Sequence, residues 1–265
     1  MSLSRIVTPL LIAVTSIFCL PSGASASVIA HSDMALSNMR FSLSDSSAQL
    51  VWTDVWYGTV QAQAQDTSSG SDSDNDSLLG NSGSITATAN TAHVTSSAHY
   101  TPTSATTQSD LSLPDYHSQG DGSAVSTLDN YFMITGGSPL DTLDVTIEFD
   151  YFGTLFARAG PSDFFSIALA ALLNLQDLSG NSLGSDFINE MESGSGTSFG
   201  PLSYAGTLAI NTTLSYGTEY WLYAEADSEV YGYAVPLPGA IIFMLSGIVA
   251  LLSFSKRKPL LHTNQ

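Results

Sequence analysis

Basic side chains are scarce in this sequence. It holds six Lys and Arg against 24 Asp and Glu, and all the acidic residues lie between Asp33 and Glu229. Four of the six basic residues occupy the terminal segments, which leaves Arg40 and Arg158 in the body and gives that body a formal charge of −22. Binding to phosphate backbones relies on clustered Lys and Arg, so nucleic acid is excluded as an expected partner.

Cysteine is nearly absent as well. The one thiol, Cys19, lies inside an apolar N-terminal stretch. The body that follows therefore has neither disulfides nor thiol chemistry, and cysteine usage does not distinguish an oxidising compartment from a reducing one.

A secretory signal peptide is predicted over residues 1–26. Arg5 precedes an apolar run from Ile6 to Leu20, and small side chains follow at Ala24 and Ala26, as signal peptidase requires. We place the cleavage after Ala26, so that the mature chain begins at Ser27. A retained anchor is the alternative, but so short an apolar run before small residues favours cleavage.

A second apolar segment lies near the C-terminus. No side chain from Ala234 to Phe254 is charged, and a helix of about 20 residues covers the hydrocarbon core of a membrane. Three cations follow directly, so the positive-inside rule places the tail in the cytoplasm and the acidic body outside. A buried core helix is the alternative to this transmembrane helix. The cations are Lys256, Arg257 and Lys258.

A proline motif precedes the apolar segment and consists of Val235, Pro236, Leu237, Pro238 and Gly239. Because proline disfavours a helical residue before it, we expect this stretch to be extended and accessible to an enzyme. The motif, the apolar helix and the basic cluster together resemble the tripartite C-terminal sorting signal of PEP-CTERM proteins, in its VPLPA-type variant. Gly239 stands where that variant usually has Ala.

This resemblance covers the tail alone and implies a bacterial fate for the chain. An exosortase would cut an inner-membrane-anchored precursor near the proline motif, leaving the body at the cell surface or outside the cell. The resemblance also implies an association with extracellular polysaccharide.

Alternation of apolar and polar residues predicts a mainly β body. Five apolar residues alternate with four polar ones from Leu143 to Tyr151, and Glu219 to Asp227 alternates in the same way. Glycine-bearing turns separate most of the candidate strands, which favours an antiparallel, jelly-roll-like β-sandwich. The other candidates are Leu50 to Ala64, Ile85 to Tyr100, Leu128 to Thr135, Phe164 to Leu175 (a helix in the alternative interpretation) and Tyr204 to Leu214.

The front of the body, to about Gly122, is rich in Ser, Thr, Ala, Gln and Asp, whereas branched and aromatic residues become frequent afterwards. This composition fits either one sandwich with a polar front half or two unequal parts. We favour one domain over residues 27–233, between the signal peptide and the sorting segment 234–265.

Catalytic patterns are few. Gly180 to Gly184 has the Gly-x-Ser-x-Gly spacing of a nucleophile elbow. In that fold a histidine follows the serine, and here the only later histidine, His262, lies beyond the apolar segment. The motif therefore reads as an ordinary turn, and we expect a protein that is not an enzyme.

One acidic stretch has the spacing of a calcium loop. Asp72, Asp74 and Asp76 offer carboxylates at alternate positions, but Ser77 replaces the turn glycine and Gly83 stands where a bidentate Glu would close the site. We favour a flexible, solvated acidic loop and keep weak calcium binding as the alternative; no other cofactor is expected. A second metal hypothesis pairs His93 with His99, although six residues along a strand put them too far apart to share an ion directly.

Aromatic residues gather in two stretches, where they form either core or a stacking platform for sugars. Taken together, the sequence predicts an exported, non-enzymatic cell-surface or extracellular-matrix protein. The alternative is a polysaccharide-binding or polysaccharide-cleaving sandwich. The aromatic residues are Trp52, Trp56 and Tyr57 in front, and Trp221, Tyr223, Tyr231 and Tyr233 behind.

Overall fold

The computed structural model describes residues 27–113 and 118–235, and every regular element in them is a β-strand. No helix able to cross a membrane is found among these residues. The signal peptide, most of the proline motif, the predicted transmembrane helix and the basic cluster lie outside the described residues. The strands are β1 (Val28–Leu43), β2 (Gln49–Trp52), β3 (Tyr57–Asp66), β4 (Gly70–Leu79), β5 (Ile85–Asn90), β6 (Val94–Thr101), β7 (Ser104–Leu113), β8 (Gln119–Thr135), β9 (Thr142–Ala159), β10 (Phe164–Asp177), β11 (Ser182–Ser195), β12 (Ser198–Ser215) and β13 (Glu219–Tyr233).

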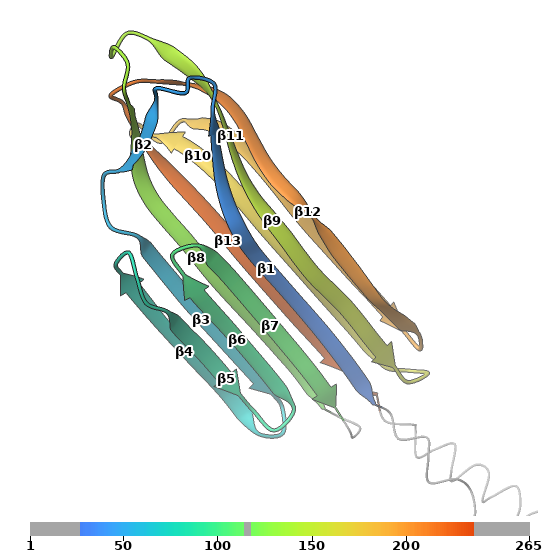
Figure 1. The fold of residues 1–265 in the computed structure, drawn as a ribbon. Helices are drawn as coiled ribbons and strands as arrows, with labels where there is room; N and C mark the ends of the chain where they lie inside the picture. Colours follow the sequence, from blue (N-terminus) through green and yellow to red (C-terminus); the bar gives the residue numbers. More distant parts are fainter. Residues whose placement is uncertain (1–26, 114–117, 236–265) are drawn as a thin grey trace, which may run out of the picture.

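The strands form two antiparallel sheets packed face to face, as the sequence predicts for a β-sandwich (Figure 1). Sheet A has the order β12-β9-β1-β7-β6-β5. Sheet B has the order β11-β10-β13-β8-β3-β4, and β2 pairs with the far end of β8 beyond β3. Both sheets therefore contain strands from the polar front half and from the rear half, with the rear-half strands on one side of each sheet and the front-half strands on the other.

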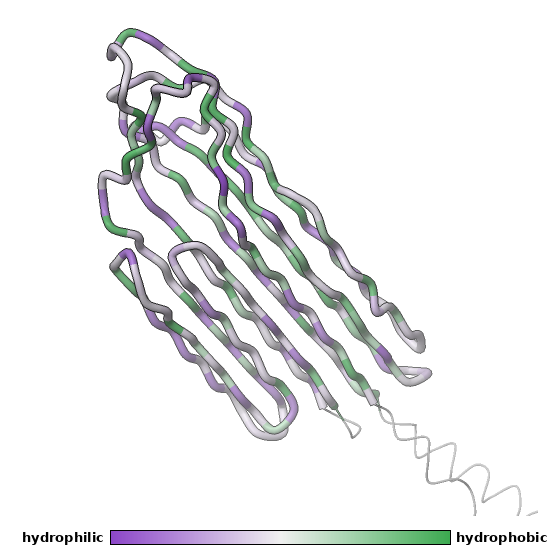
Figure 2. The backbone as a smooth tube through the Cα atoms, in the orientation of Figure 1, coloured by the Kyte–Doolittle hydropathy of each residue, from purple (hydrophilic) through white to green (hydrophobic). Residues whose placement is uncertain are grey.

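Alternation along each strand decides which residues face the core, as the alternating hydropathy of the long strands shows (Figure 2). On β9, Leu143, Val145, Ile147 and Phe149 are buried, whereas the polar residues between them reach solvent. The same holds on β13, and Phe164 to Leu175 is a strand and not a helix. The strand predictions for the rear half are thus confirmed.

The front half contains more strands than the sequence predicts. Two predicted strands are each divided in two: Leu50 to Ala64 into β2 and β3, and Ile85 to Tyr100 into the hairpin of β5 and β6. The prediction of a flexible acidic loop at Asp72 to Asp76 is wrong, because this stretch is the edge strand β4, paired with β3 along its whole length.

Small residues fill much of the core between the sheets. A Cβ atom added to Gly120 or Gly232 of sheet B would lie within 2.4 Å of the Leu111 side chain from sheet A, so these glycines make room for a large neighbour. Buried serines tie the sheets together: the hydroxyls of Ser109 and Ser228 lie 3.2 Å apart, across the two sheets.

Both ends of the described chain lie at the same end of the sandwich, where β1 begins and β13 ends (Figure 1). The turn between β9 and β10 forms hydrogen bonds with both of these chain ends. The N–H of Gly160 donates to the carbonyl of Ser27 at 3.1 Å, and the N–H of Val235 donates to the Asp163 carboxylate at 2.9 Å. We call this the proximal end.

Candidate functional site

The outer face of sheet A carries a histidine between two carboxylates. His31 Nδ1 lies 2.7 Å from Asp110 and His31 Nε2 lies 2.9 Å from Asp33. These hydrogen bonds, the one to Asp110 first, raise the pKa of His31 to about 9. Because both ring nitrogens donate, the imidazolium has no free nitrogen with which to take a proton. His31 therefore joins neighbouring strands and is unsuited to act as a general base.

The same face holds Arg40 at a bulge of β1. The register between β1 and β9 shifts between Ser37 and Arg40, and the guanidinium makes two bonds of 2.7 and 2.8 Å to Asp150 and one of 3.2 Å to Glu148. A bidentate pair of this kind fixes the geometry of the bulge. It leaves no free cation for a ligand at this point.

The carboxylates of the predicted calcium loop point inward from β4 to the neighbouring edge of the other sheet. Asp72 and Asp74 accept hydrogen bonds from the backbone N–H groups of Asn90 and Thr88 on β5, at 2.8 and 3.0 Å. Asp76 lies on the same face of β4 and, within the described part of the chain, accepts a hydrogen bond only from the N–H of Ser77. Two of the three carboxylates are thus occupied in capping an edge strand.

No group of three or more His, Cys, Asp or Glu side chains able to hold a metal ion occurs in the described part of the chain. His93 lies in the turn between β5 and β6, whereas His99 lies on the outer face of sheet A and bonds Thr86 at 2.9 Å. The structure does not bring these two histidines together on one strand.

The Gly-x-Ser-x-Gly motif forms the turn of the hairpin between β10 and β11. The side chain of Asp177 accepts hydrogen bonds from the N–H groups of Ser179 and Asn181, and Ser182 begins β11. The interpretation as an ordinary turn is confirmed, because a nucleophile elbow joins a strand to a helix.

The aromatic residues separate into core and surface. Trp56 is buried, and its ring centroid lies 4.4 Å from that of Trp52, which also contacts Phe41 and Phe132. In contrast, Trp221 and Tyr223 lie on the outer face of sheet B, with ring centroids 5.8 Å apart. The two front tryptophans therefore pack with the core, whereas Trp221 and Tyr223 are available for stacking with a ligand.

Strand register brings two more tyrosines beside Trp221 and Tyr223. Tyr131 on β8 is directly opposite Trp221, and Asp129 is directly opposite both Tyr223 on β13 and Tyr57 on β3. We call the four rings of Tyr57, Tyr131, Trp221 and Tyr223, with Asp129 among them, the aromatic platform. Its rings are half-buried except for Tyr57, which is 39% exposed.

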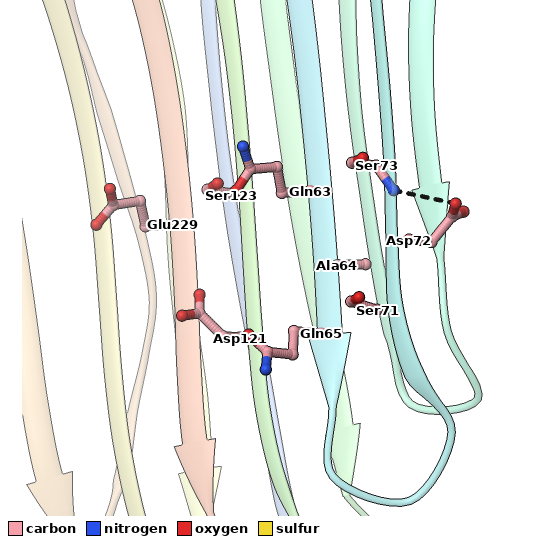
Figure 3. Close-up of a pocket in the computed structure, with 9 residues that line it drawn as sticks. All are labelled: Gln63, Ala64, Gln65, Ser71, Asp72, Ser73, Asp121, Ser123 and Glu229. Atoms are coloured by element: carbon pink, nitrogen blue, oxygen red, sulfur yellow. Dashed lines mark hydrogen bonds between the residues drawn. The ribbon is translucent and has the colours of Figure 1, made fainter.

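A shallow polar trough of about 500 Å³ lies further along the same face, towards the proximal end. Figure 3 shows its glutamine, serine and acidic side chains projecting from neighbouring strands of sheet B. The trough is lined by amides, hydroxyls and carboxylates, of which the Asp72 carboxylate turns towards the N–H of Asn90 on β5. Its lining residues are Gln63, Ala64, Gln65, Ser71, Asp72, Ser73, Asp121, Ser123 and Glu229.

Carboxylates on this face repel one another. Burial raises the pKa of Asp227 to about 7, and the charges of Glu229 and Glu225 add to the rise. Burial also raises the pKa of Asp129 to about 6, with a smaller contribution from Asp54. Among the described residues, both arginines belong to sheet A, so no arginine offsets these charges.

Comparison with protein-family models gives no match to the sequence. Neither the curated proteins nor the solved structures give a significant match. The function is therefore argued from the residues and geometry of this chain.

Sequence reasoning identified Trp221 and Tyr223 but missed Tyr131, Asp129 and the trough. A local signal was present, because Asp129 and Tyr131 alternate with the buried Leu128, Asn130 and Phe132. What places them beside β13 is the pairing of strands some 90 residues apart in sequence. Such a register depends on the whole fold and has no local signature.

Proposed function

We propose that this chain is an exported, non-enzymatic cell-surface or extracellular-matrix protein, with a jelly-roll-like sandwich as its ectodomain and a PEP-CTERM-like sorting signal at its C-terminus. Signal peptidase and an exosortase would process its two ends, and the apolar segment would hold the precursor in the inner membrane. The calcium hypothesis forms no part of this proposal.

One observation carries the proposal: the boundaries of the sandwich coincide with the two predicted processing sites. Strand β1 begins at Val28, two residues after Ala26, and β13 ends at Tyr233, two residues before the proline motif. Cleavage at both sites would therefore remove no strand and break no hydrogen bond between the described strands. A folded body with processing sites at its margins is what maturation at two ends requires.

The geometry of the proximal end supports the same proposal. Ser27 and Val235 bond to one turn, so the two residues next to the proposed cleavage sites lie at the same end of the sandwich. The opposite end carries the loops at 44–48, 136–141, 178–181 and 216–218. An anchored precursor would thus present those loops away from the membrane.

Mass spectrometry of the protein recovered from the host surface or medium tests the proposal. We expect a chain that begins at Ser27 and ends between Val235 and Gly239. Changing Pro236 and Pro238 to Ala should make an uncut, membrane-bound precursor accumulate, because the segment would lose its extended conformation.

The matched control changes Pro102 and Pro139, which lie in turns of the body, to Ala and should leave processing intact. Peptides from Ile241 to Phe254 on the surface protein of a host with an intact exosortase would refute the sorting proposal. Peptides that retain Phe18 to Ala24 would refute the cleavage after Ala26.

A further inference from the structure

We infer that the outer face of sheet B binds a polysaccharide chain without acidic groups, which stacks on the aromatic platform and extends into the polar trough. The inference rests on surface chemistry alone and is independent of how the tail is processed.

The platform presents rings from three adjacent strands. Tyr57, Tyr131 and Trp221 come from β3, β8 and β13, and the ring planes of Trp221 and Tyr223 meet at 52°. An aromatic ring buries apolar area well while keeping a polar edge in water. A pyranose ring has the matching form, with a C–H face to cover the ring and hydroxyls around its rim.

Polar atoms of the platform are free to bind such hydroxyls. Among the described residues, no hydrogen bond involves the hydroxyl of Tyr57, the hydroxyl of Tyr131 or the indole N–H of Trp221. Asp129 is half-buried between Tyr57 and Tyr223, and its carboxylate accepts no hydrogen bond within the described chain. A carboxylate accepts several hydrogen bonds at once, so a pair of sugar hydroxyls would satisfy it.

The distance between platform and trough indicates a polymer. Tyr223 and Glu229 are six residues apart on β13, which corresponds to about 20 Å at the usual rise per residue. The trough adds the amides of Gln63 and Gln65 and the hydroxyl of Ser123 along the same direction. A chain that lies along β8 and β13 would reach both regions, whereas a single sugar would reach only one.

Charge determines which polysaccharide fits. Six carboxylates on β8 and β13 face outward, whereas Arg40, Arg158, His31 and His99 all belong to sheet A. Polysaccharides with uronate or sulfate groups would be repelled. Uncharged chains would bind through stacking and hydrogen bonds, which depend little on salt. The six carboxylates are Asp121, Asp129, Glu219, Glu225, Asp227 and Glu229.

Affinity electrophoresis of the purified chain tests the inference, with hydroxyethylcellulose, galactomannan and dextran as neutral probes and alginate as the acidic one. We expect at least one neutral probe to retard the protein and alginate not to do so. Retardation should persist in about 1 M NaCl, where the Debye length falls to about 3 Å. The variants Trp221→Ala and Tyr57→Ala should each weaken it about tenfold, since stacked rings dominate such sites.

The matched control is Phe152→Ala, which removes an aromatic ring that is 52% exposed on the other sheet and should leave retardation unchanged. Circular dichroism identifies any variant that fails to fold, and Tyr57→Ala, at an already exposed ring, keeps the test informative if Trp221→Ala does not fold. The inference is overturned if none of the neutral probes retards the protein. It is also overturned if the Tyr57→Ala variant is retarded as strongly as the unaltered protein. Retention by cationic chitosan alone, lost in salt, would also overturn it, because charge would then explain the binding.

Discussion

Tyr100 lies on β6 with no exposed surface, and its ring covers Gly58 of the opposite sheet. A Cβ atom at Gly58 would lie 2.3 Å from that ring, so this contact requires glycine. The hydroxyl of Tyr100 has no hydrogen-bond partner among the described residues, and burial raises its pKa to about 12. The ring packs well, but its hydroxyl pays a desolvation penalty of about 1–3 kcal/mol.

We therefore expect Tyr100→Phe to raise the free energy of unfolding by about 1 kcal/mol, because it removes an unpaired buried hydroxyl and keeps the ring. Denaturant unfolding measures the change. Tyr216→Phe is the matched control: the Tyr216 ring is also buried, but its hydroxyl donates to Asp45 at 2.8 Å, so this change should lower stability. Equal effects of the two variants would contradict the account.

Asp227 makes the stability of the fold depend on pH, in a direction that follows from the shift of its pKa. Its carboxyl has a pKa of about 7 in the fold against an ordinary 3.8, so the folded protein binds this proton more tightly than the unfolded chain does. The stability that Asp227 contributes is complete below about pH 4 and is lost as the pH rises through about 7. One of its carboxylate oxygens is buried and has no hydrogen-bond partner among residues 27–113 and 118–235, in line with that loss.

Asp227→Asn should consequently raise stability by about 1 kcal/mol at about pH 8, after allowance for solvent screening, and change little at about pH 4. Thermal unfolding across this pH range measures the effect. Asp141→Asn removes the same charge from an exposed loop and serves as the control. A gain that is equal at both pH values would argue against a buried carboxylate as the cause.

At the scale of the strands, both edges of sheet B are protected in the same way. Asp72 and Asp74 cap β5 from one edge, and Asp186 on the other edge accepts the N–H of Ala209 on β12 at 2.8 Å. Inward-pointing charges on edge strands prevent pairing with other chains. A stretch that reads as a solvated loop is therefore a strand that closes the side of the sandwich.

Changing Asp72 and Asp74 to Ala should lower the melting temperature and promote association, because two N–H groups of β5 lose their acceptors. Each hydrogen bond contributes about 0.5–1.5 kcal/mol. Differential scanning calorimetry and light scattering measure the two effects. The control is Asp76→Ala, which removes a charge from the same face of β4 without uncapping β5. Asp72→Ala and Asp74→Ala are also made singly. If Asp76→Ala has as large an effect as either of them, the loss of charge and not the loss of a hydrogen bond to β5 is responsible.

The strands that the sequence predicts well are those with branched and aromatic residues on the buried face, as on β9 and β13. Strands of the front half alternate too, but β3 and β5 bury Ala62, Ala64, Ala87 and Ala89, whose contrast with Ser and Thr is weak. Strand β4 has almost no buried residue to signal its alternation. Only part of the aromatic platform could be predicted, for a related reason. Alternation shows which face of the sheet a residue occupies, but it does not show which residue lies opposite on the neighbouring strand.

At the scale of the whole molecule, the two halves of the sequence depend on each other. Strand β8 pairs with β3 from the front half and β13 from the rear half, and β1 pairs with β7 and β9 in the same manner. Most of these pairings join residues far apart in the chain. We therefore expect the two sheets to form slowly and in one cooperative step, as is usual for non-local β topologies.

The place of β13 between β10 and β8 also determines how the molecule bears a load. The strand ends at Tyr233, just before the tail leaves, and pairs with both neighbours over nearly its whole length. A pull on the tail against the far end of the sandwich acts along β13, at right angles to its ladder hydrogen bonds. Those bonds are then sheared in parallel and must fail together, so β13 resists extraction far better than a strand peeled from an edge.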